Sequence, residues 1–540
     1  VPARLASARR DLLRVRVTYD VCVYGGIAGG VTAAVAAARQ GKTVVLVNPG
    51  RHLGGLTSGG LGATDIGNEA VVGGLARDVY RRIGRAYGRD EVFRFEPHVA
   101  ERVFETLSAE AHLSVVPGRR VTAVRAAGGR ISSLQLDDGG AIEARAFIDS
   151  SYEGDVMALA GVRYAVGREP VAQYGESLNG VRAETPHHQF EAPVDPFVTS
   201  GDPRNGLLPC VQDEAPGEAG RGDGHIQAYN FRLCLTRAAG NRRPLDPPSA
   251  YDPRRYEILG RYFAALVAAG RSPRFSDFFL IVEMPNGKTD FNNRGGFSTD
   301  HIGANWEYPD GDHATRDRIW RDHESYTRGI FHFLRTDPRV PANVRREAEA
   351  WGLCRDEFPD TGGWPHQLYV REGRRMLGRY VVTQADCQGA RRADDAVGMG
   401  AYTMDSHNIR RIVHPDGPAR PGALRNEGDV QIGVAPYPIS YRAITPRAEE
   451  CRNLLVPVCL SATHIAHGSI RMEPVFMVLG ESAGVAACRA LDAGKDVQEV
   501  DVAALQRDLR QMGQILEFTP PTGPREWAHH YHIYESETSS

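Results

Sequence analysis

Hydrophobic positions near the start of the chain follow a strand–turn–helix–strand pattern. An apolar run at residues 21–24 leads into the glycine-rich turn at residues 25–30. An alanine-rich helical stretch at 31–40 follows, and then a second apolar run at 43–47. Glycines in such a turn let backbone N–H groups approach a pyrophosphate, and the N-terminus of the helix adds partial positive charge. The pattern therefore predicts a Rossmann-type unit that binds a dinucleotide.

Two positions depart from the usual form of this motif. Ile27 stands where the middle glycine of G-x-G-x-x-G is expected, so close approach depends on Gly25 and Gly26. Asn48 ends the second strand, where an acidic residue usually binds the adenosine ribose. An amide can still hydrogen-bond a hydroxyl group, but it carries no charge.

The remaining pattern alternates between helical and strand-like segments. Residues 70–112 read as helices, and residues 113–150 alternate in strand fashion between glycine turns, which predicts a small β-meander. Residues 165–245 are rich in Pro, Gly, His and acids and predict long surface loops. The later segments are expected to be mostly helical at 250–380, short strands at 395–450, an apolar strand at 453–460 and a Gly/Ala-rich helix at 473–490.

Composition narrows the class of protein. With 540 residues, 42% apolar residues and a net charge of −3, the chain is typical of a globular protein and indicates no nucleic-acid partner. No run reaches the roughly 18 apolar residues of a membrane span. The eight cysteines are scattered without a C-x-x-C pair, which argues against an iron–sulfur cluster, a zinc ribbon or a dithiol motif. Arg9-Arg10 is interpreted as a surface pair, and a removed export signal stays open, so localisation is left as cytoplasmic or exported.

Several longer segments carry a family resemblance. They are VYGGIAGGVTAA (23–34), HLGGLTSGGLG (52–62), FIDSSYEGDVMALAG (147–161), DFNNRGGFSTDHIGAN (290–305), QLYVREGRRMLGRYVVTQADC (367–387), GMGAYTMDSHN (398–408) and residues 441–487. The chain resembles the FAD-dependent oxidoreductases with a glutathione-reductase-type FAD fold, in the subgroup often labelled xanthan lyase-like. The acid expected at position 48 is the one family feature that is missing.

The resemblance implies an α/β fold with a Rossmann-type FAD-binding domain, a β-meander and an inserted mixed α+β substrate domain. The expected division is a first FAD-binding part at 18–165, an inserted substrate or cap region at 166–395, largely helical after 250, a returning FAD-binding part at 396–515 that ends in the flavin helix, and a tail at 516–540. Only one nucleotide fingerprint is visible, because Gly398-Met399-Gly400 lacks the required continuation. The dinucleotide is therefore expected to be a resident FAD.

The same resemblance assigns the cofactor-binding residues. The expected set is Gly25, Gly26, Ile27, Ala28, Gly29, Gly30, Asn48, Pro49, Arg51, Gly54, Gly55, Thr57, Ser58, Gly59, Gly60, Leu61, Val121, Ser150, Glu153, Glu473 and Gly480. The glycine turn would hold the pyrophosphate, Asn48 the adenosine ribose and residues 57–61 the isoalloxazine ring. The helix after Arg471 would direct its N-terminus at the flavin N1/C2 edge, where reduced flavin carries negative charge.

Candidates for catalysis lie in the two polar segments near that helix. Oxidation by a flavin usually needs a base for the substrate proton, and the candidates are His407, His464 and His467, with Arg471 adding positive charge. Each histidine could instead be a hydrogen-bonded packing residue. No metal site is expected, because these residues show no recognised ligand spacing. Cys387 and Cys459 are read as buried thiols rather than covalent flavin links.

Two further polar groups have open interpretations. Asn292, Asn293, Ser298, Thr299 and Asn305 suit either a hydroxylated ligand or loop capping. Arg371, Arg374 and Arg375 favour an ion-pair network over an anion clamp.

The leading hypothesis is an FAD enzyme that oxidises a C–OH or C–N bond of a polar small molecule. The hydride would pass to flavin N5 and then to oxygen or an external acceptor. A flavin monooxygenase that uses NAD(P)H is the alternative. A carbohydrate-binding or lyase protein is a third possibility, against which the nucleotide unit counts.

Overall fold

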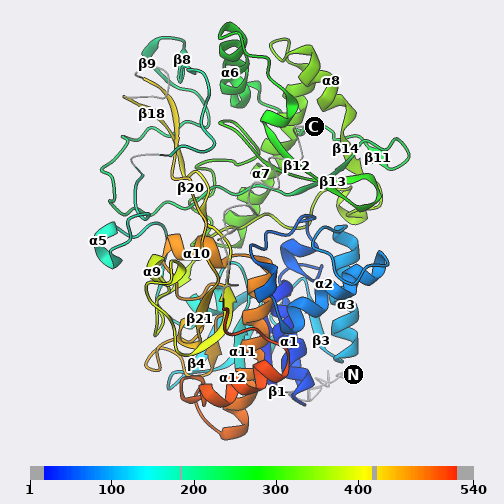
Figure 1. Ribbon diagram of the computed structural model, residues 1–540, viewed down its shortest axis with the longest axis vertical. Helices are drawn as coiled ribbons and strands as arrows, with labels where there is room; N and C mark the ends of the chain where they lie inside the picture. Colours follow the sequence, from blue (N-terminus) through cyan, green and yellow to red (C-terminus); the bar gives the residue numbers. More distant parts are fainter. Residues whose placement is uncertain (1–17, 183–184, 416–421, 520–540) are drawn as a thin grey trace, which may run out of the picture.

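The computed structural model describes residues 18–182, 185–415 and 422–519. The predictions for Arg9-Arg10 and for most of the 516–540 tail lie outside these residues. Figure 1 shows the described chain as a lower half, in which the blue and orange segments meet, and an upper half built mainly from green segments.

The lower half is organised around a seven-stranded sheet. Its order is β3-β2-β1-β6-β5-β4, with β22 also paired to β6. The strands are β1 Thr18–Tyr24, β2 Val44–Asn48, β3 Ser114–Pro117, β4 Val121–Ala127, β5 Arg130–Leu136, β6 Ala141–Asp149 and β22 Leu454–Leu455. Strands β1, β2, β3, β6 and β22 run parallel, whereas β4, β5 and β6 form an antiparallel meander. The predicted α/β fold with a Rossmann-type unit and a meander is thus confirmed.

Helices from opposite ends of the chain cover this sheet. They are α1 Ala28–Arg39, α2 Gly74–Ala86, α3 Pro97–Glu110, α11 Glu473–Ala493 and α12 Val502–Gln511. Helices α1 and α11 pack directly on each other, and Thr32 Oγ1 donates a hydrogen bond to Met477 O across the contact at 2.8 Å. The sequence was expected to contain no apolar run of membrane-spanning length, but helix α11 is long and apolar enough by length and composition alone. Of its most apolar window, 89% is buried inside the protein.

The upper half holds a five-stranded antiparallel sheet and three longer helices. The sheet order is β11-β14-β10-β13-β12, and its strands are β10 Leu233–Thr236, β11 Arg242–Arg243, β12 Phe279–Met284, β13 Lys288–Asn293 and β14 Gly352–Cys354. The helices are α6 Glu257–Ala268, α7 His313–Thr336 and α8 Ala342–Ala350. The prediction of a largely helical region after residue 250 missed β12, β13 and β14, because these strands are short and lie between stronger helical patterns.

The remaining α-helices and strands of the described chain are short. They are α4 Asp155–Leu159, β7 Tyr164–Ala165, α5 Val171–Tyr174, β8 Phe197–Thr199, β9 Asp202–Leu207, β15 Arg375–Met376, α9 Gln384–Cys387, β16 Ala396–Gly400, β17 Met404–Ser406, β18 Arg410–His414, β19 Ala423–Glu427, β20 Val430–Ile432, β21 Tyr437–Ser440 and α10 His464–Ile470. The ladder of β18 and β19 lies in the upper half, where Figure 1 shows β18 above β20, and Leu424 N in β19 bonds Val194 O. The polar segment around His407 is thereby brought beside the upper sheet.

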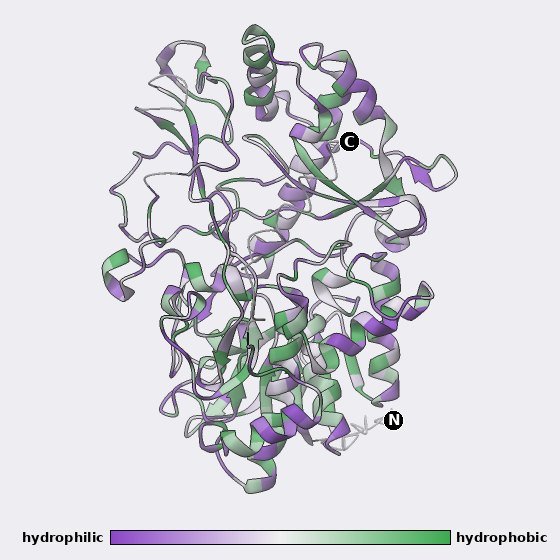
Figure 2. Cartoon of the chain, in the orientation of Figure 1, coloured by the Kyte–Doolittle hydropathy of each residue, from purple (hydrophilic) through white to green (hydrophobic). Residues whose placement is uncertain are grey.

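The two halves differ in how apolar they are. In Figure 2 the most hydrophobic ribbon gathers on the helices and strands at the centre of the lower half, while the upper half mixes apolar and polar colours throughout. The lower core consists mainly of Ala, Val, Leu and Ile from α1, α11 and the sheet, whereas the upper core is rich in Phe, Tyr and Trp.

Candidate functional site

The glycine turn before α1 is shaped by close backbone contacts. Gly25 has a φ of 101°, and a Cβ there would lie 2.6 Å from Ser151 N. A Cβ on Gly30 would overlap the carbonyl oxygen of Gly25, and one on Gly29 would lie 2.7 Å from Phe476 O in α11. Only glycine fits these positions, so the turn presents its backbone without side chains in the way.

Asn48 is bound to the glycine turn itself. Its Oδ1 accepts a hydrogen bond from Gly26 N at 3.0 Å, and its Nδ2 donates to His52 O at 2.8 Å. The buried amide therefore joins the turn to the loop that follows β2. A carboxylate could not supply the second bond, which gives a physical reason for the departure from the usual acid.

A cavity of about 140 Å³ opens beside this turn. Its lining residues are Gly25, Gly26, Ile27, Asn48, Pro49, Gly50, Arg51, His52, Gly55, Ser151, Tyr152, Glu153, His366 and Gln367. Ile27 packs against Gly55, where a Cβ would lie 2.7 Å from the Ile27 Cβ, so the non-glycine residue in the motif is accommodated by a glycine opposite. The N-terminus of α1, which faces the turn, has no side-chain cap. This combination of free helix N–H groups and a glycine wall fits a pyrophosphate.

A second helix N-terminus lies on the far side of the loop at residues 53–61. Helix α11 also begins without a side-chain cap, and its first residue, Glu473, accepts hydrogen bonds from Thr57 Oγ1 at 2.9 Å and Tyr152 Oη at 2.6 Å. Burial raises the pKa of Glu473 to about 7, although these two hydrogen bonds act in the opposite direction. The carboxyl group therefore holds the loop to α11 without placing a full charge there at acidic pH.

The loop continues directly into the upper half. A Cβ on Gly59 would lie 2.6 Å from Gln367 Cβ, and one on Gly60, whose φ is 144°, would lie 2.5 Å from Arg232 O. Of the other residues expected to bind the cofactor, Ser150 is buried with its Oγ lacking a hydrogen-bond partner. Val121 lies in the meander outside the cavity lining, where its N–H bonds Tyr24 Oη at 3.2 Å.

The remaining residues of the expected set serve the packing around this loop. Ser58 Oγ donates to Leu53 O at 2.5 Å, and a Cβ on Gly54 would lie 2.7 Å from Ser58 Oγ. Leu61 N bonds Leu56 O at 3.0 Å, which closes the turn. Ala28 and Gly480 are buried where α1 crosses α11, and a Cβ on Gly480 would overlap Gly29 O.

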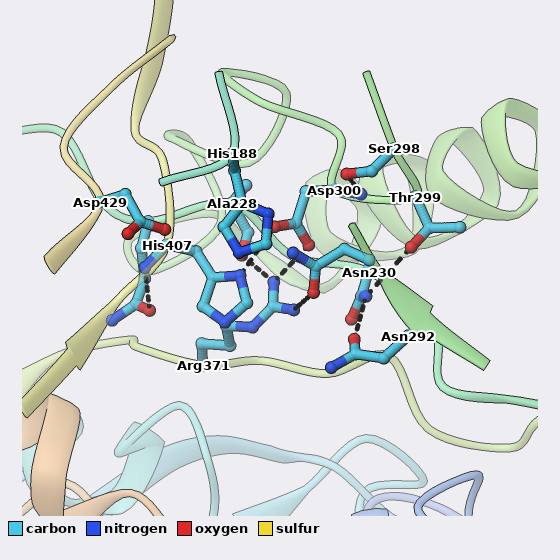
Figure 3. A network of polar contacts seen from close by, with 12 residues as sticks. His188, Ala228, Asn230, Asn292, Ser298, Thr299, Asp300, Arg371, His407 and Asp429 are labelled. Carbon is cyan, nitrogen blue, oxygen red and sulfur yellow. Dashed lines mark hydrogen bonds and ion pairs between the residues drawn. The ribbon is translucent and has the colours of Figure 1, made fainter. Parts of the chain in front are cut away.

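A network of buried charges stands where the two halves meet. Figure 3 shows His407 and Arg371 both directed at Asp300, with His188 and Asp429 nearby. His407 Nδ1 lies 2.7 Å from Asp300 Oδ2, and Arg371 Nη1 donates to Asp300 Oδ1 at 2.9 Å. Asp300 thus fixes the imidazole on one side and the guanidinium on the other.

The charges in this network shift one another's protonation. Burial and Arg371 act to lower the pKa of His407, but the carboxylates of Asp300 and Asp405 outweigh them and raise it. Burial and the charge of Asp405 raise the pKa of Asp429 to about 8. Burial, together with His407, lowers the pKa of His188 to about 4. Such opposed shifts in one cluster are typical of functional sites.

Arg471 joins this network to the start of α11. Its Nη1 donates to Tyr369 Oη at 2.7 Å, its Nη2 donates to Asp405 Oδ2 at 3.1 Å, and its Nε has no hydrogen-bond partner. The guanidinium carbons of Arg371 and Arg471 lie 4.7 Å and 5.5 Å from the centre of the Tyr369 ring. Tyr369 therefore packs against two arginines, each of which is also paired with a buried aspartate.

The other predicted histidines lie beside the network. His464 Nδ1 is 2.8 Å from Glu372 Oε2, and that carboxyl group accepts from Gln227 Nε2 at 3.2 Å. Gln227 in turn accepts a bond from His407 N, so His464 and His407 are connected through two side chains. His467 is buried, its Nδ1 has no partner, and burial lowers its pKa to about 4. The structure therefore brings His407 and Arg471 together through Asp405. His464 instead contacts Glu372.

Sequence reasoning missed several members of the network. Asp300, Tyr369, Glu372, His188 and Asp429 were not singled out as site residues. For Tyr369 and Glu372 a signal exists in the charged residues that interrupt the segment at 368–376, because buried charges require partners. Asp300, His188 and Asp429 lie far from that segment in the sequence and carry no comparable local signal. The arginines there form the expected ion pairs: Arg371 with Asp300, Arg374 with Asp155, and Arg375 with Glu169.

Two side-chain groups have the chemistry of metal ligands in the described residues. One consists of Glu96, His98 and Glu357, and its two glutamates also bind the ammonium group of Lys288, at 2.6 Å for Glu96 Oε1 and 2.7 Å for Glu357 Oε1. The other consists of His52, Glu101 and His366, of which the two histidines line the cavity and stack with ring centres 3.4 Å apart. The absence of a metal stays a prediction. Of the cysteines weighed as flavin links, burial raises the pKa of Cys387 to about 12, and Cys459 Sγ donates to Tyr152 O at 3.3 Å.

Solved structures resemble parts of this fold. The anhydrotetracycline hydroxylase OxyS from Streptomyces rimosus shares 14% identity over 32% of this chain and 41% of its own, with a TM-score of 0.21. THI4 from Thermovibrio ammonificans shares 16% over 30% of this chain and 72% of its own, with a TM-score of 0.23. Thioredoxin reductase from Streptococcus pyogenes shares 21% over 25% of this chain and 35% of its own, with a TM-score of 0.18. The chain spans less than half the length of the first solved structures it matches.

The family comparison covers far more of the chain. Residues 20–509 match the model of the family described as FAD dependent oxidoreductase. This range includes the glycine turn, the cavity, the charge network and both helices that begin without side-chain caps. The chain therefore belongs to the family of FAD dependent oxidoreductases, and it is an enzyme that uses FAD.

Proposed function

We propose that this enzyme oxidises a C–OH or C–N bond of a polar small molecule, and that oxygen or an external acceptor then takes the electrons. When bound, FAD supplies the hydride acceptor, its N5 atom. The residues argued to hold the cofactor are the glycine turn, Asn48, the loop at residues 51–61 and the N-terminus of α11. The two helix N-termini and the glycine contacts support this assignment.

The observation that carries the proposal is the pairing of His407 with Asp300. With Nδ1–H donating a hydrogen bond to the Asp300 carboxylate, Nε2 is the nitrogen that can take a proton from a substrate hydroxyl or amine. His407 keeps 11% of its side chain exposed, and Asp405 lies 3.7 Å from its Nε2. We therefore assign His407 as the base and Asp300 as the residue that positions it.

Neighbouring amides support a polar substrate. Asn230 Nδ2 donates to Asn292 Oδ1 at 2.9 Å and to Thr299 Oγ1 at 3.3 Å, and Asn230 Oδ1 is buried without a partner. Figure 3 shows these side chains on the same side of Arg371 as Asp300. Uncharged groups that both donate and accept suit a ligand with hydroxyl or amine groups.

The test begins with the holoenzyme under anaerobic conditions. Sugars, alcohols and amines are screened for bleaching of the flavin absorption, and the best substrate is used for steady-state kinetics. We expect His407→Gln to lower kcat/KM by about 10²- to 10⁴-fold with flavin content unchanged. In the wild type, kcat/KM should rise with pH through an apparent pKa above 6.5, because the acidic neighbours raise the pKa of His407.

His464→Gln is the matched control, since His464 is also buried beside a carboxylate. If His464→Gln and not His407→Gln removes the activity, the assignment of the base is wrong. If no compound bleaches the flavin but the holoenzyme rapidly oxidises NADPH, the proposed oxidation is wrong and the monooxygenase alternative replaces it.

A further inference from the structure

Two cysteines face each other across the upper sheet. Strands β10 and β14 pair antiparallel with Leu235 opposite Leu353, a register that places Cys234 directly opposite Cys354. Their Sγ atoms lie 3.7 Å apart. Directly opposed residues in antiparallel strands have Cα atoms about 4.5–5.5 Å apart, within the range of about 4.4–6.8 Å that a disulfide requires.

The surroundings leave the two thiols to each other. Both residues are 0% exposed, and they form a small cluster with the apolar side chains of Met284 and Phe358. All eight cysteines of the chain are free thiols in this structure. A small rotation of the two side chains would bring the sulfur atoms from 3.7 Å to the bond length of about 2.05 Å without moving the strands.

We propose that Cys234 and Cys354 are a modification site that closes to a disulfide by exchange with a low-molecular-weight disulfide such as oxidised glutathione. One thiolate attacks the glutathione disulfide, breaks its S–S bond and releases one glutathione. The second cysteine then attacks the mixed disulfide, forms the Cys234–Cys354 bond and releases the other. Two electrons pass from the protein sulfurs to glutathione, and the two thiol protons end on the released thiols.

The position of the pair indicates when this exchange takes place. Burial raises the pKa of the Cys234 thiol well above its usual range, so the closed sheet protects it from attack. Strand β14 has three residues, and only the two-residue strand β11 covers its outer side. We infer that exchange occurs during folding or when these short outer strands open locally.

The bond would join the two segments that border the flavin site. Strand β10 directly follows Asn230 and Arg232, whose side chains contact Asn292 and Asp290 in β13. Strand β14 leads into the loop that carries His366 and Gln367 to the cavity. Since a covalent bond across a long loop restricts the unfolded chain, the oxidised protein should resist heat better than the reduced one.

The experiment compares full-length protein refolded in a glutathione redox buffer with protein kept in dithiothreitol. Both samples are unfolded, alkylated and mapped by mass spectrometry. We expect the oxidised sample to be about 2 Da lighter before alkylation, with six of the eight cysteines alkylated and a cross-linked peptide pair containing residues 234 and 354. Its Tm should be higher by several degrees.

Two variants fix the interpretation. Cys234→Ala should abolish both the mass loss and the gain in Tm, whereas Cys451→Ala, which removes a buried thiol elsewhere, should keep both. Alkylation of all eight cysteines in the oxidised wild type, or a cross-link between other residues, would overturn the proposal. Because the peptide map uses the wild type, this result does not depend on how well a variant folds.

Discussion

The contact between α1 and α11 and the network around Asp300 are equally buried, yet they are held by opposite means. In the lower half two helices touch backbone to backbone, because a Cβ on Gly480 would overlap Gly29 O and one on Gly484 would overlap Ala33 O. In the upper half large charged side chains fill the interior, and Arg232 and Arg371 are 2% and 1% exposed.

The difference shows what each region can tolerate. The helix contact depends on the absence of atoms, so adding a side chain breaks it whatever its chemistry. The charge network depends on matched partners, so removing one group leaves another buried without compensation. The helix contact should therefore be most sensitive to substitutions that add volume, and the charge network to substitutions that remove a charge.

The largest effect is expected at the glycine turn. Gly30→Leu should abolish flavin retention, because its side chain would overlap Gly25 O and displace the turn that faces the cavity. The measurement is flavin content after gel filtration in added FAD. Gly240→Leu, where no heavy atom lies within 4 Å of a Cβ, should bind FAD normally. Stoichiometric FAD in folded Gly30→Leu would contradict the role of the turn.

Loss of one charge in the upper half should be nearly as damaging. Arg232 binds Asp290 Oδ2 at 2.7 Å and Asp65 Oδ2 at 3.0 Å. Arg232→Met should lower the free energy of unfolding by about 3–5 kcal/mol, because Asp290 would be a buried unpaired charge. Urea unfolding of the variant and the wild type measures this difference in the free energy of unfolding.

Two comparisons sharpen this result. Adding Asp290→Asn to Arg232→Met should recover part of the loss, since the unpaired charge is gone. Arg204→Met, which breaks an exposed pair with Asp202, should change the free energy of unfolding by less than about 1 kcal/mol. Equal losses of unfolding free energy in Arg204→Met and Arg232→Met would show that burial does not determine how much an ion pair contributes to stability.

A buried acid in the lower half gives a dependence on pH. Burial raises the pKa of Glu481 from 4.5 to about 7, although Leu75 N donates to it at 2.9 Å. Between these values the unfolded chain releases the proton while the folded chain keeps it, so the free energy of unfolding falls as pH rises. Glu481→Gln should make this fall shallower, because Glu473 still contributes its own part, and should be more stable than the wild type above pH 7 by roughly 3 kcal/mol. Parallel curves for the two proteins from pH 4.5 to 8 would refute the assignment.

The smallest effect is expected at Asn48. Asn48→Leu removes the bonds to Gly26 N and His52 O and should weaken FAD binding by about 5- to 100-fold, because buried polar groups are left unpaired. Asn48→Asp keeps the acceptor for Gly26 N and should lose less. Fluorescence titration with FAD measures the affinity of both variants. A larger loss of affinity in Asn48→Asp than in Asn48→Leu would argue against the role of Asn48 in joining the glycine turn to the loop after β2.

The lower half could be predicted from the sequence because its determinants are local. The turn, the helix and the flanking strands lie within about thirty residues, and each follows from spacing and residue size. Helix α11 was also expected, from its Gly/Ala-rich pattern, although its end extends to Ala493.

The charge network could not be predicted because its pairs are distant in sequence. Asp300 lies 71 residues from Arg371 and 107 from His407, and nothing in a single sequence matches one charge to another over such a separation. His407 and Arg471 were selected for their positions near the flavin helix, but Asp300 was not. The strands β12 and β13 were missed for a related reason, since strand pairing is settled by partners outside the segment.

The hydrogen bond between Thr32 and Met477 joins residues 445 positions apart, so it can form only long after α1 has been synthesised. At synthesis rates of about 5–20 residues per second, the ribosome needs roughly 20–90 s to produce the helix that covers α1. During that interval the glycine face of α1 lies open, and every residue of the upper sheet is synthesised before α11. The upper sheet can therefore form first, and α1 gains the helix that packs on it only after α11 has been synthesised.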